Sequence, residues 1–333
     1  MLLTASCVRI ERVQESVPAE IKILPLGVTS HNAPSMTKAP YPQYTYFGVF
    51  AFYTDGQEAT PWTTVWPATD YFTDAAFFYY GSTASGWDVS TATGVHKPYY
   101  WPIDGSLMFA GYSPHKSQTE SVKSVSFNKN ALEKAPNPYL EIEFEQNTDP
   151  NNMVDLLWFD IKDVNDGKTI STTAQSVPVQ FKHALSMVTL KFTDINDYYD
   201  LESVVLEDCI NKSTFYSGNT CGWMPQITEL ADYTLKSSKT KLNQWNSCDL
   251  LIIPQYLDGI FPVVGGSLDS GVDVVLSFVV ADSYGSQELR LPLKTYTEKW
   301  EIGKHYTYTI SVDADPIGFG APNVTINTQV VSM

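Results

Sequence analysis

The stretch YYWPIDGSLMFAGYSP, residues 99–114, carries the pattern on which the fold depends. A Trp-Pro step and an Asp-Gly turn lead into SLMFAGY, which is apolar at almost every position. A strand with one face in water alternates apolar and polar residues, whereas a strand covered on both faces does not. The stretch therefore predicts a strand inside a β core, with Trp101, Leu107 and Phe109 buried and the turn at Asp104 exposed.

Two kinds of strand pattern recur along the rest of the chain. Residues 140–145, 289–294 and 305–312 alternate apolar with polar side chains, which is typical of half-buried antiparallel strands. FGVFAFY at 47–53 and VVLSFVVA at 274–281 are apolar on both faces, like SLMFAGY. Helical periodicity is short and weak. We therefore expect an all-β fold of two Greek-key sandwiches, with long loops such as residues 70–98.

A change of composition near residues 171–178 predicts the boundary between the two sandwiches. The segment TISTTAQSVP is polar and ends in Pro178. After it the apolar residues change phase, from odd positions before His183 to even positions after Ser186. A one-residue slip turns every side chain to the other face, so we expect a bulge or bend there. The expected parts are an N-terminal segment at 1–40 and sandwiches at 41–176 and 177–333.

The composition excludes some classes of function. Apolar residues make up 43% of the 333 residues, enough for a core, and charged residues only 17%. The formal net charge is −16 and the pI is about 4.6. Such a surface repels phosphate backbones, so we expect no nucleic-acid partner.

The first residues, MLLTASC, resemble the end of a bacterial lipoprotein signal, in which the Cys is acylated. Cys7 is therefore the candidate lipidation site, and the alternative is an ordinary apolar start. No segment reaches 18 apolar residues, so we expect an anchored protein, not an inserted one. The other cysteines are Cys209, Cys221 and Cys248, an odd number. Cys209 and Cys221 pairing across a hairpin and buried free thiols are equally consistent with the sequence.

No recognised catalytic constellation is found in the sequence. The five histidines are far apart and none has metal-ligand spacing. We expect His183 to be a hydrogen-bonded structural residue and His305 to lie solvated on the polar face of its strand. There is no nucleophile elbow, phosphate-binding loop or dinucleotide fingerprint. We expect no enzyme activity, no catalytic residues, no cofactor and no metal.

Tryptophans keep a second function class open. Trp62, Trp66, Trp87 and Trp101 cluster in the first half of the chain. Exposed indole rings would stack on sugars and indicate a surface glycan-binding lipoprotein of β-sandwich fold. The alternative is that these rings belong to the core, because aromatic side chains each bury roughly 150–250 Å².

Six segments, taken in order, resemble the fimbrillin-like family of Gram-negative anaerobes, which are lipoprotein precursors of type V pilus subunits. Two of them are FGVFAFY and the opening stretch at 99–114. The others are VDLLWFDIK at 154–162, FKHALSMVTLKF at 181–192, DLLIIPQ at 249–255 and KWEIGKHYTYTISV at 299–312. MTKAP at 36–40 also resembles the short threonine-basic-alanine motif of the family, which usually has Arg where this chain has Lys38. Cys7 matches the family's lipobox position.

The resemblance implies two transthyretin-like β-sandwich domains and a mechanism of assembly. The precursor is exported and lipidated, and a protease then cuts after a basic residue. The cut releases the first strand, and a strand of another subunit fills the groove. The implied partners are other pilin subunits, the lipid anchor of the outer membrane and a host or bacterial surface receptor. The implied location is a fimbria on the cell surface.

The chain offers residues for each part of this mechanism. The candidate displaced strand contains Ile21, Ile23, Leu24, Leu26 and Val28, interrupted by Pro25. Among the basic residues Arg9, Arg12, Lys22 and Lys38, only Lys38 follows that strand, so it is the candidate cleavage site. The candidate donor strand at the C-terminus has Val324, Ile326, Thr328 and Val330 on one face, and it could equally be a closing strand of the second sandwich. We therefore expect a structural pilus subunit that contributes to adhesion, with glycan binding as the alternative.

Overall fold

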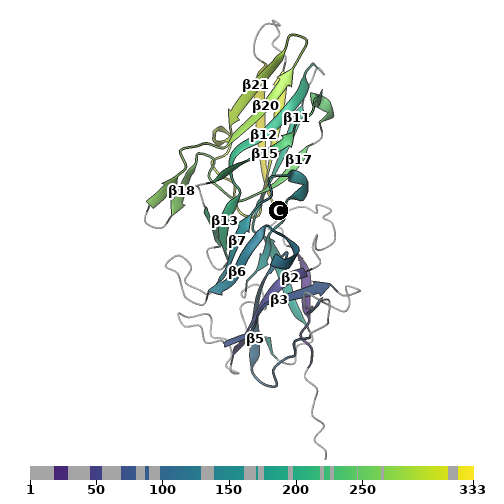
Figure 1. Ribbon diagram of the computed structural model, residues 1–333, viewed down its shortest axis with the longest axis vertical. Coiled ribbons are helices and arrows are strands. Elements are labelled where there is room, and N and C mark those ends of the chain that lie inside the picture. Colours follow the sequence, from purple (N-terminus) through teal and green to yellow (C-terminus); the bar gives the residue numbers. More distant parts are fainter. Residues whose placement is uncertain are drawn as a thin grey trace, which may run out of the picture.

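The computed structural model describes most of the chain as a set of β-sheets stacked along one long axis (Figure 1). The described ranges are residues 19–28, 46–54, 69–79, 87–89, 98–128, 139–160, 170–171, 176–193, 198–217, 221–225, 229–245, 247–263, 266–313 and 322–333. The described helical elements are short 3₁₀ turns at Lys116–Gln118, Pro150–Asn152, Leu242–Gln244 and Leu293–Thr295. The predicted all-β fold is confirmed.

The N-terminal half forms a sheet that closes on itself. Its strands follow the order β2-β3-β4-β1-β10-β8-β5-β9, and β2 also pairs with β5, so the first seven form a ring. We call this ring, with β9 attached, the closed sheet. Its strands are β1 Ile23–Val28, β2 Tyr46–Thr54, β3 Thr69–Tyr79, β4 Trp87–Val89, β5 Ser106–Ser113, β8 Leu157–Phe159, β9 Ile170–Ser171 and β10 Val177–His183.

β2 and β5 are apolar on both faces because both faces are covered. Leu107 and Phe109 point to the inner core of the closed sheet, together with Trp101, which is 2% exposed. Met108 and Tyr112 belong to a second core on the other face of β5. The predicted burial of Trp101, Leu107 and Phe109 is therefore confirmed. Asp104 in the turn is exposed, as predicted.

A middle sheet covers that second face. It has the order β14-β13-β7-β6 and consists of β6 Val122–Asn128, β7 Tyr139–Glu145, β13 Lys212–Tyr216 and β14 Gly222–Pro225. The alternating residues of β7 place Leu140, Ile142 and Phe144 in the shared core, where Phe215 of β13 also lies. Figure 1 shows β6, β7 and β13 at the waist of the molecule, between the closed sheet and the C-terminal half.

The C-terminal half is a sandwich of two sheets around one core. One sheet has the order β17-β11-β22-β23, with β11 Ser186–Thr193, β17 Cys248–Ile252, β22 Lys304–Asp313 and β23 Asn323–Ser332. The other has the order β15-β12-β20-β21, with β16 beside β12; its strands are β12 Asp200–Ile210, β15 Leu230–Lys236, β16 Thr240–Lys241, β20 Val275–Ala281 and β21 Ser286–Pro292. A two-stranded hairpin, β18 Ile260–Val263 and β19 Gly266–Asp269, extends from the side of the molecule (Figure 1).

The predicted bend between His183 and Ser186 is the point where the chain changes sheets. β10 ends at His183 in the closed sheet, and β11 begins at Ser186 in the C-terminal sandwich. The two residues between them, Ala184 and Leu185, are fully buried. The phase slip in the sequence is therefore confirmed as a change of sheet.

The division of the chain into two domains between residues 176 and 177 stays a prediction. Strand pairing crosses this boundary in two places. β10 follows the boundary but pairs with β1 and β8 in the closed sheet. β13 pairs with β7 of the N-terminal half, Phe215 opposite Ile142. The two halves therefore share the middle sheet.

The expectation of a long loop over residues 70–98 is wrong. Residues 69–79 form β3, which pairs with β2, and residues 87–89 form β4. The apolar pattern of β3 is broken because Asp74 has a positive φ of 48° and the register with β2 shifts there. The buried residues are consequently Phe72, Ala75 and Phe77, without the strict period of two that marks a strand in sequence.

Candidate assembly site

The first described segment, residues 19–28, closes the ring of the N-terminal sheet. Residues 19–22 run beside 99–101, and the Ile21 amide donates to the carbonyl of Tyr99 over 2.8 Å. β1 then runs parallel to β10 and meets β4 in the antiparallel direction. Removing the segment would therefore open a groove between β4 and β10.

The buried face of this segment is apolar. Ile21 and Ile23 are both 0% exposed and belong to the inner core of the closed sheet, which also contains Phe181 of β10. Leu24 is half-buried. Leu26 and Val28 have their backbone in β1, but their side chains lie outside the described part of the structure.

The ladder between β1 and β10 is short and irregular. Ile23, Leu24 and Pro25 pair with successive residues of β10, and the register shifts before Val28. The Val177 amide donates to the Lys22 carbonyl, whereas the Ile21 amide donates to Tyr99 on the opposite side. Because backbone groups alternate along a strand, the nitrogen of Pro25 points away from β10, where proline removes no hydrogen bond from this ladder. The segment therefore combines buried apolar side chains with a ladder that is interrupted by a register shift.

Most of the predicted processing residues lie outside the described ranges. Cys7, Arg9, Arg12 and Lys38 all fall there. Lys22 is described: it is half-buried, and its carbonyl accepts a hydrogen bond of 2.7 Å from the Val177 amide.

The last strand, β23, closes one sheet of the C-terminal sandwich. It pairs with β22 at ten consecutive positions, from Asn323 opposite Asp313 to Ser332 opposite Lys304, without a shift of register. Val324 and Ile326 pack against the sandwich core but remain half-exposed, and Val330 is 48% exposed. In this structure β23 is therefore an edge strand of its own sandwich.

The tryptophans do not form the exposed platform that sugar binding needs, as far as their side chains are described. Trp101 is buried and packs edge-on against Phe109, with ring centroids 6.0 Å apart. Trp62 and Trp66 lie outside the described ranges. Trp87 is the first residue of β4, and its side chain is likewise outside the described part.

Cys209 is a buried free thiol, so the Cys209–Cys221 disulfide considered from the sequence is not formed. Burial raises the pKa of the Cys209 thiol well above its usual value, and Asp208 and Asp232 raise it further. Burial, with a smaller effect of Asp249, also raises the pKa of Cys248. A thiol with a raised pKa is a poor nucleophile at neutral pH.

Both histidines singled out from the sequence form hydrogen bonds. His183 is 5% exposed, and its Nδ1 lies 2.9 Å from Oδ2 of Asp155, so the expected structural role is confirmed. His305 lies on the polar face of β22, half-buried, with Nε2 2.7 Å from the hydroxyl of Thr189.

A buried polar cluster around Asp74 was not predicted from the sequence. The Tyr112 hydroxyl donates to Oδ1 of Asp74 over 2.8 Å, and the Lys116 ammonium lies 2.6 Å from Oδ2. His115 Nε2 is 3.5 Å from Oδ1. Burial raises the pKa of Tyr112 and lowers that of His115. Asp74 lies at the bulge of β3 and Tyr112 lies near the end of β5, so the cluster links these two strands.

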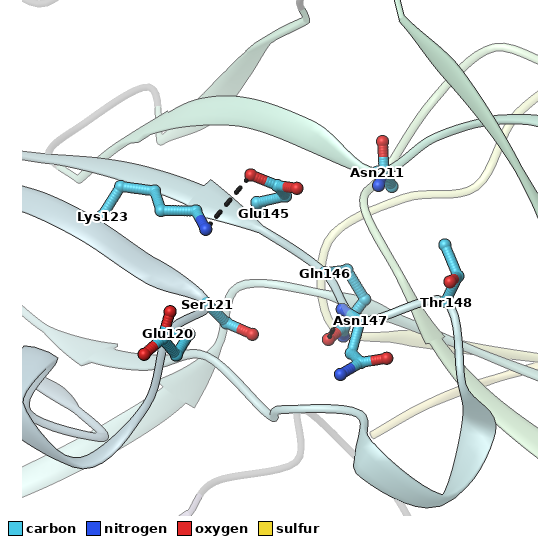
Figure 2. Close-up of a pocket in the computed structure, with 8 residues that line it drawn as sticks. All are labelled: Glu120, Ser121, Lys123, Glu145, Gln146, Asn147, Thr148 and Asn211. Carbon is cyan, nitrogen blue, oxygen red and sulfur yellow. Dashed lines mark hydrogen bonds and ion pairs between the residues drawn. The ribbon is translucent and has the colours of Figure 1, made fainter.

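One pocket of about 260 Å³ lies at the end of the middle sheet (Figure 2). Its lining is polar throughout and consists of Glu120, Ser121, Lys123, Glu145, Gln146, Asn147, Thr148 and Asn211. Lys123 pairs with Glu145 over 3.2 Å, and Gln146 Nε2 donates to the carbonyl of Leu251 on β17 over 2.8 Å. Small-molecule binding sites are usually lined mainly by apolar and aromatic side chains. The polar lining of this pocket is more typical of a solvent-filled gap between sheets than of such a site.

The described part of the chain has no group of three or more His, Cys, Asp or Glu side chains placed to hold a metal ion. Within the same ranges, no helix has the length and apolarity needed to cross a bilayer.

Comparison with known proteins identifies the family. A model of the fimbrillin-like family matches residues 42–330, which is most of the chain. The chain belongs to the fimbrillin-like family. A comparison with curated proteins finds no match. This family is one of fimbrial structural subunits, and membership supports association with other pilin subunits at the cell surface.

Solved structures share the fold of this fimbrillin-like protein. A putative cell adhesion protein from Bacteroides uniformis has 15% identity and a TM-score of 0.54, and the match covers 97% of this chain and 99% of that one. A fimbrial protein from Bacteroides vulgatus has 14% identity and a TM-score of 0.55, over 86% and 92% of the two chains. A putative cell adhesion protein from Bacteroides ovatus has 14% identity and a TM-score of 0.54, over 95% and 98%. At this identity the likeness concerns the fold alone.

Proposed function

We propose that this protein is a structural subunit of a cell-surface fimbria that assembles by strand exchange after proteolysis and contributes to adhesion. The observation that carries the proposal is the placement of β1. It is a buried member of the closed sheet, yet it precedes β2 by a connection of 17 residues that contains Lys38. A cut after Lys38 would leave β1 joined to the sheet by non-covalent contacts only.

The groove left by β1 would attract another strand. Its two edges, β4 and β10, would present unpaired backbone groups, which bind an incoming strand by hydrogen bonds. The sites of Ile21 and Ile23 would be empty and apolar. Burying an aliphatic side chain contributes roughly 1.5–3 kcal/mol, so a donor strand with apolar residues at alternate positions would be held firmly.

β23 is the proposed donor strand. Its alternating residues Val324, Ile326, Thr328 and Val330 match the apolar alternation of the segment that contains Ile21 and Ile23. Because it is an edge strand with half-exposed side chains, it loses less buried surface on leaving its sandwich than a central strand such as β22 would. In the assembled fibre β23 of one subunit would occupy the place of β1 in the next.

The proposed location follows from the N-terminal sequence and the family. Acylation of Cys7 would anchor the exported precursor to the outer membrane. Cleavage after Lys38 would separate the subunit from the N-terminal fragment, which carries both the anchor and β1. One proteolytic step would thus free the subunit and open its groove. Adhesion would follow from contacts that the assembled fibre makes with a surface receptor.

Limited digestion with trypsin, followed by size-exclusion chromatography and electron microscopy, tests the proposal. The digested protein should form ladders or filaments, and so should a variant that lacks residues 1–28. A Lys38→Gln variant should resist this cut and form neither ladders nor filaments, whereas Lys22→Gln should assemble like the unmodified chain. A digested protein that has lost β1 and remains strictly monomeric would contradict strand exchange.

A further inference from the structure

β23 is a sheet edge that lacks the usual protection against pairing. Sheet edges are normally guarded by charged side chains, by proline, by bulges or by being very short, because an open edge is a template for another strand. β23 is ten residues long, NVTINTQVVS, with no charged residue and no proline. Its register with β22 is uninterrupted, so no bulge twists it away.

The other described edge strands each carry at least one of these devices. β6 has Lys123 and a register shift, and β21 has Glu288, Arg290 and Pro292. Charged residues occur in β15 (Asp232 and Lys236), β17 (Asp249) and β19 (Asp269), and β15 also has two register shifts. Proline occurs in β14 (Pro225) and β18 (Pro262). The strands β9 and β16 have only two residues each. Among the described strands, β23 alone has an unguarded edge.

We propose that β23 pairs edge to edge with β23 of a second copy, antiparallel about a two-fold axis. The resulting interface joins two four-stranded sheets into one continuous sheet. This dimer goes beyond the proposed strand exchange, because it forms between intact chains in which β1 and β23 both keep their places.

The side chains of β23 favour a second copy as the partner. Thr325, Asn327 and Gln329 are exposed on one face, and Val324 and Ile326 lie on the other. When two β23 strands pair antiparallel with the same faces aligned, amide and hydroxyl side chains lie opposite amide and hydroxyl side chains. Aliphatic side chains likewise lie opposite aliphatic ones, and both kinds of cross-strand pair are favourable.

Charge supports the same partner. The chain carries a formal net charge of −16, so most surfaces of two copies repel each other. The edge of β23 is neutral over ten residues, and its exposed polar face continues onto the uncharged Thr307, Thr309 and Ser311 of β22. Two copies can therefore approach along this edge with little direct repulsion.

Charge reversal on the intact chain tests the dimer. Thr325 and Gln329 face the neutral Ser311 and Thr307 across β22, so charged replacements there leave the sandwich intact. We expect sedimentation velocity to show a concentration-dependent dimer for the unmodified protein. The double variants Thr325→Lys/Gln329→Lys and Thr325→Glu/Gln329→Glu should each raise the dissociation constant by about tenfold or more, because like charges then oppose each other.

Mixing the Lys and Glu variants should restore the dimer, since opposite charges then face each other across the two-fold axis. Gln287→Lys, on the exposed edge strand β21, is the matched control and should dimerise like the unmodified chain. A protein that is monomeric at every concentration, or a dimer that neither double variant weakens, would overturn the inference. Failure to restore the dimer on mixing would also overturn it. None of these outcomes bears on strand exchange, which requires the removal of β1.

Discussion

Single residues in the closed sheet carry tertiary contacts that their sequence neighbours do not reveal. Asp74 is separated from Tyr112 and Lys116 by about forty residues, yet its carboxylate binds both. Residue type predicted the structural role of His183, because a histidine at a phase slip is usually hydrogen-bonded. The Asp74 cluster could not be predicted, since it depends on which strand lies beside β5.

His115 makes the stability of the closed sheet sensitive to acid. Burial lowers its pKa below the usual 6.5, only partly offset by Asp74. His115 therefore takes up its proton at a higher pH in the unfolded chain than in the folded chain. Its contribution to the free energy of unfolding is fully present above pH 6.5 and is lost as the pH falls through the folded-state pKa. Denaturant titrations at several pH values should show a steeper loss of unfolding free energy on acidification for the unmodified protein than for His115→Asn. Parallel losses would contradict this assignment.

Gly111 is required by the close approach of β2 and β5. A Cβ at this position would lie 2.5 Å from the carbonyl oxygen of Gly48 and 2.5 Å from the ring of Phe159. The carbonyl belongs to the backbone of β2 and cannot turn aside. We expect Gly111→Ala to lower the free energy of unfolding by roughly 1–3 kcal/mol in urea titrations. A stability equal to that of the unmodified chain would show that the strands can separate without cost.

Strands with a regular apolar pattern lie where the sequence predicts them. β5, β7 and β22 have the burial that their apolar patterns indicated. β3 was missed because a bulge at Asp74 shifts the phase, and short strands such as β4 carry too few residues to show a period. The position of β1 between β4 and β10 could not be predicted either, because parallel pairing brings together segments about 150 residues apart.

The middle sheet makes the two halves of the molecule depend on each other. β13 and β14 follow the expected boundary, but Phe215 is fully buried in a core shared with β7. Gln146 adds a polar link, because its side chain binds the backbone of Leu251 in the C-terminal sandwich. The sequence predicts a bulge or bend at residues 183–186 but does not indicate that later strands return to the N-terminal half.

This dependence predicts that residues 177–333 do not fold fully alone. Without β7, the apolar face of β13 is exposed, and without β1 and β8, β10 has no sheet to join. We expect the isolated fragment to aggregate or to give a poorly dispersed NMR spectrum, and co-expression with residues 1–176 to restore a soluble complex. A monomeric, well-dispersed fragment with the thermal stability of the full chain would contradict this prediction.

Strand complementation tests whether the subunit exchanges its first strand. A chain that lacks residues 1–28 and carries Ile326→Asp, so that its own β23 cannot act as a donor, is mixed with a synthetic peptide of residues 322–333. Binding is measured by calorimetry together with the rise in Tm. A peptide of residues 19–28 serves as the positive control, and the 322–333 peptide with Ile326→Asp as the negative control. We expect stoichiometric binding and a higher Tm with the 322–333 peptide and with the 19–28 peptide, and neither effect with the Ile326→Asp peptide. A truncated chain that binds the 19–28 peptide but not the 322–333 peptide would show that β23 is not the donor strand.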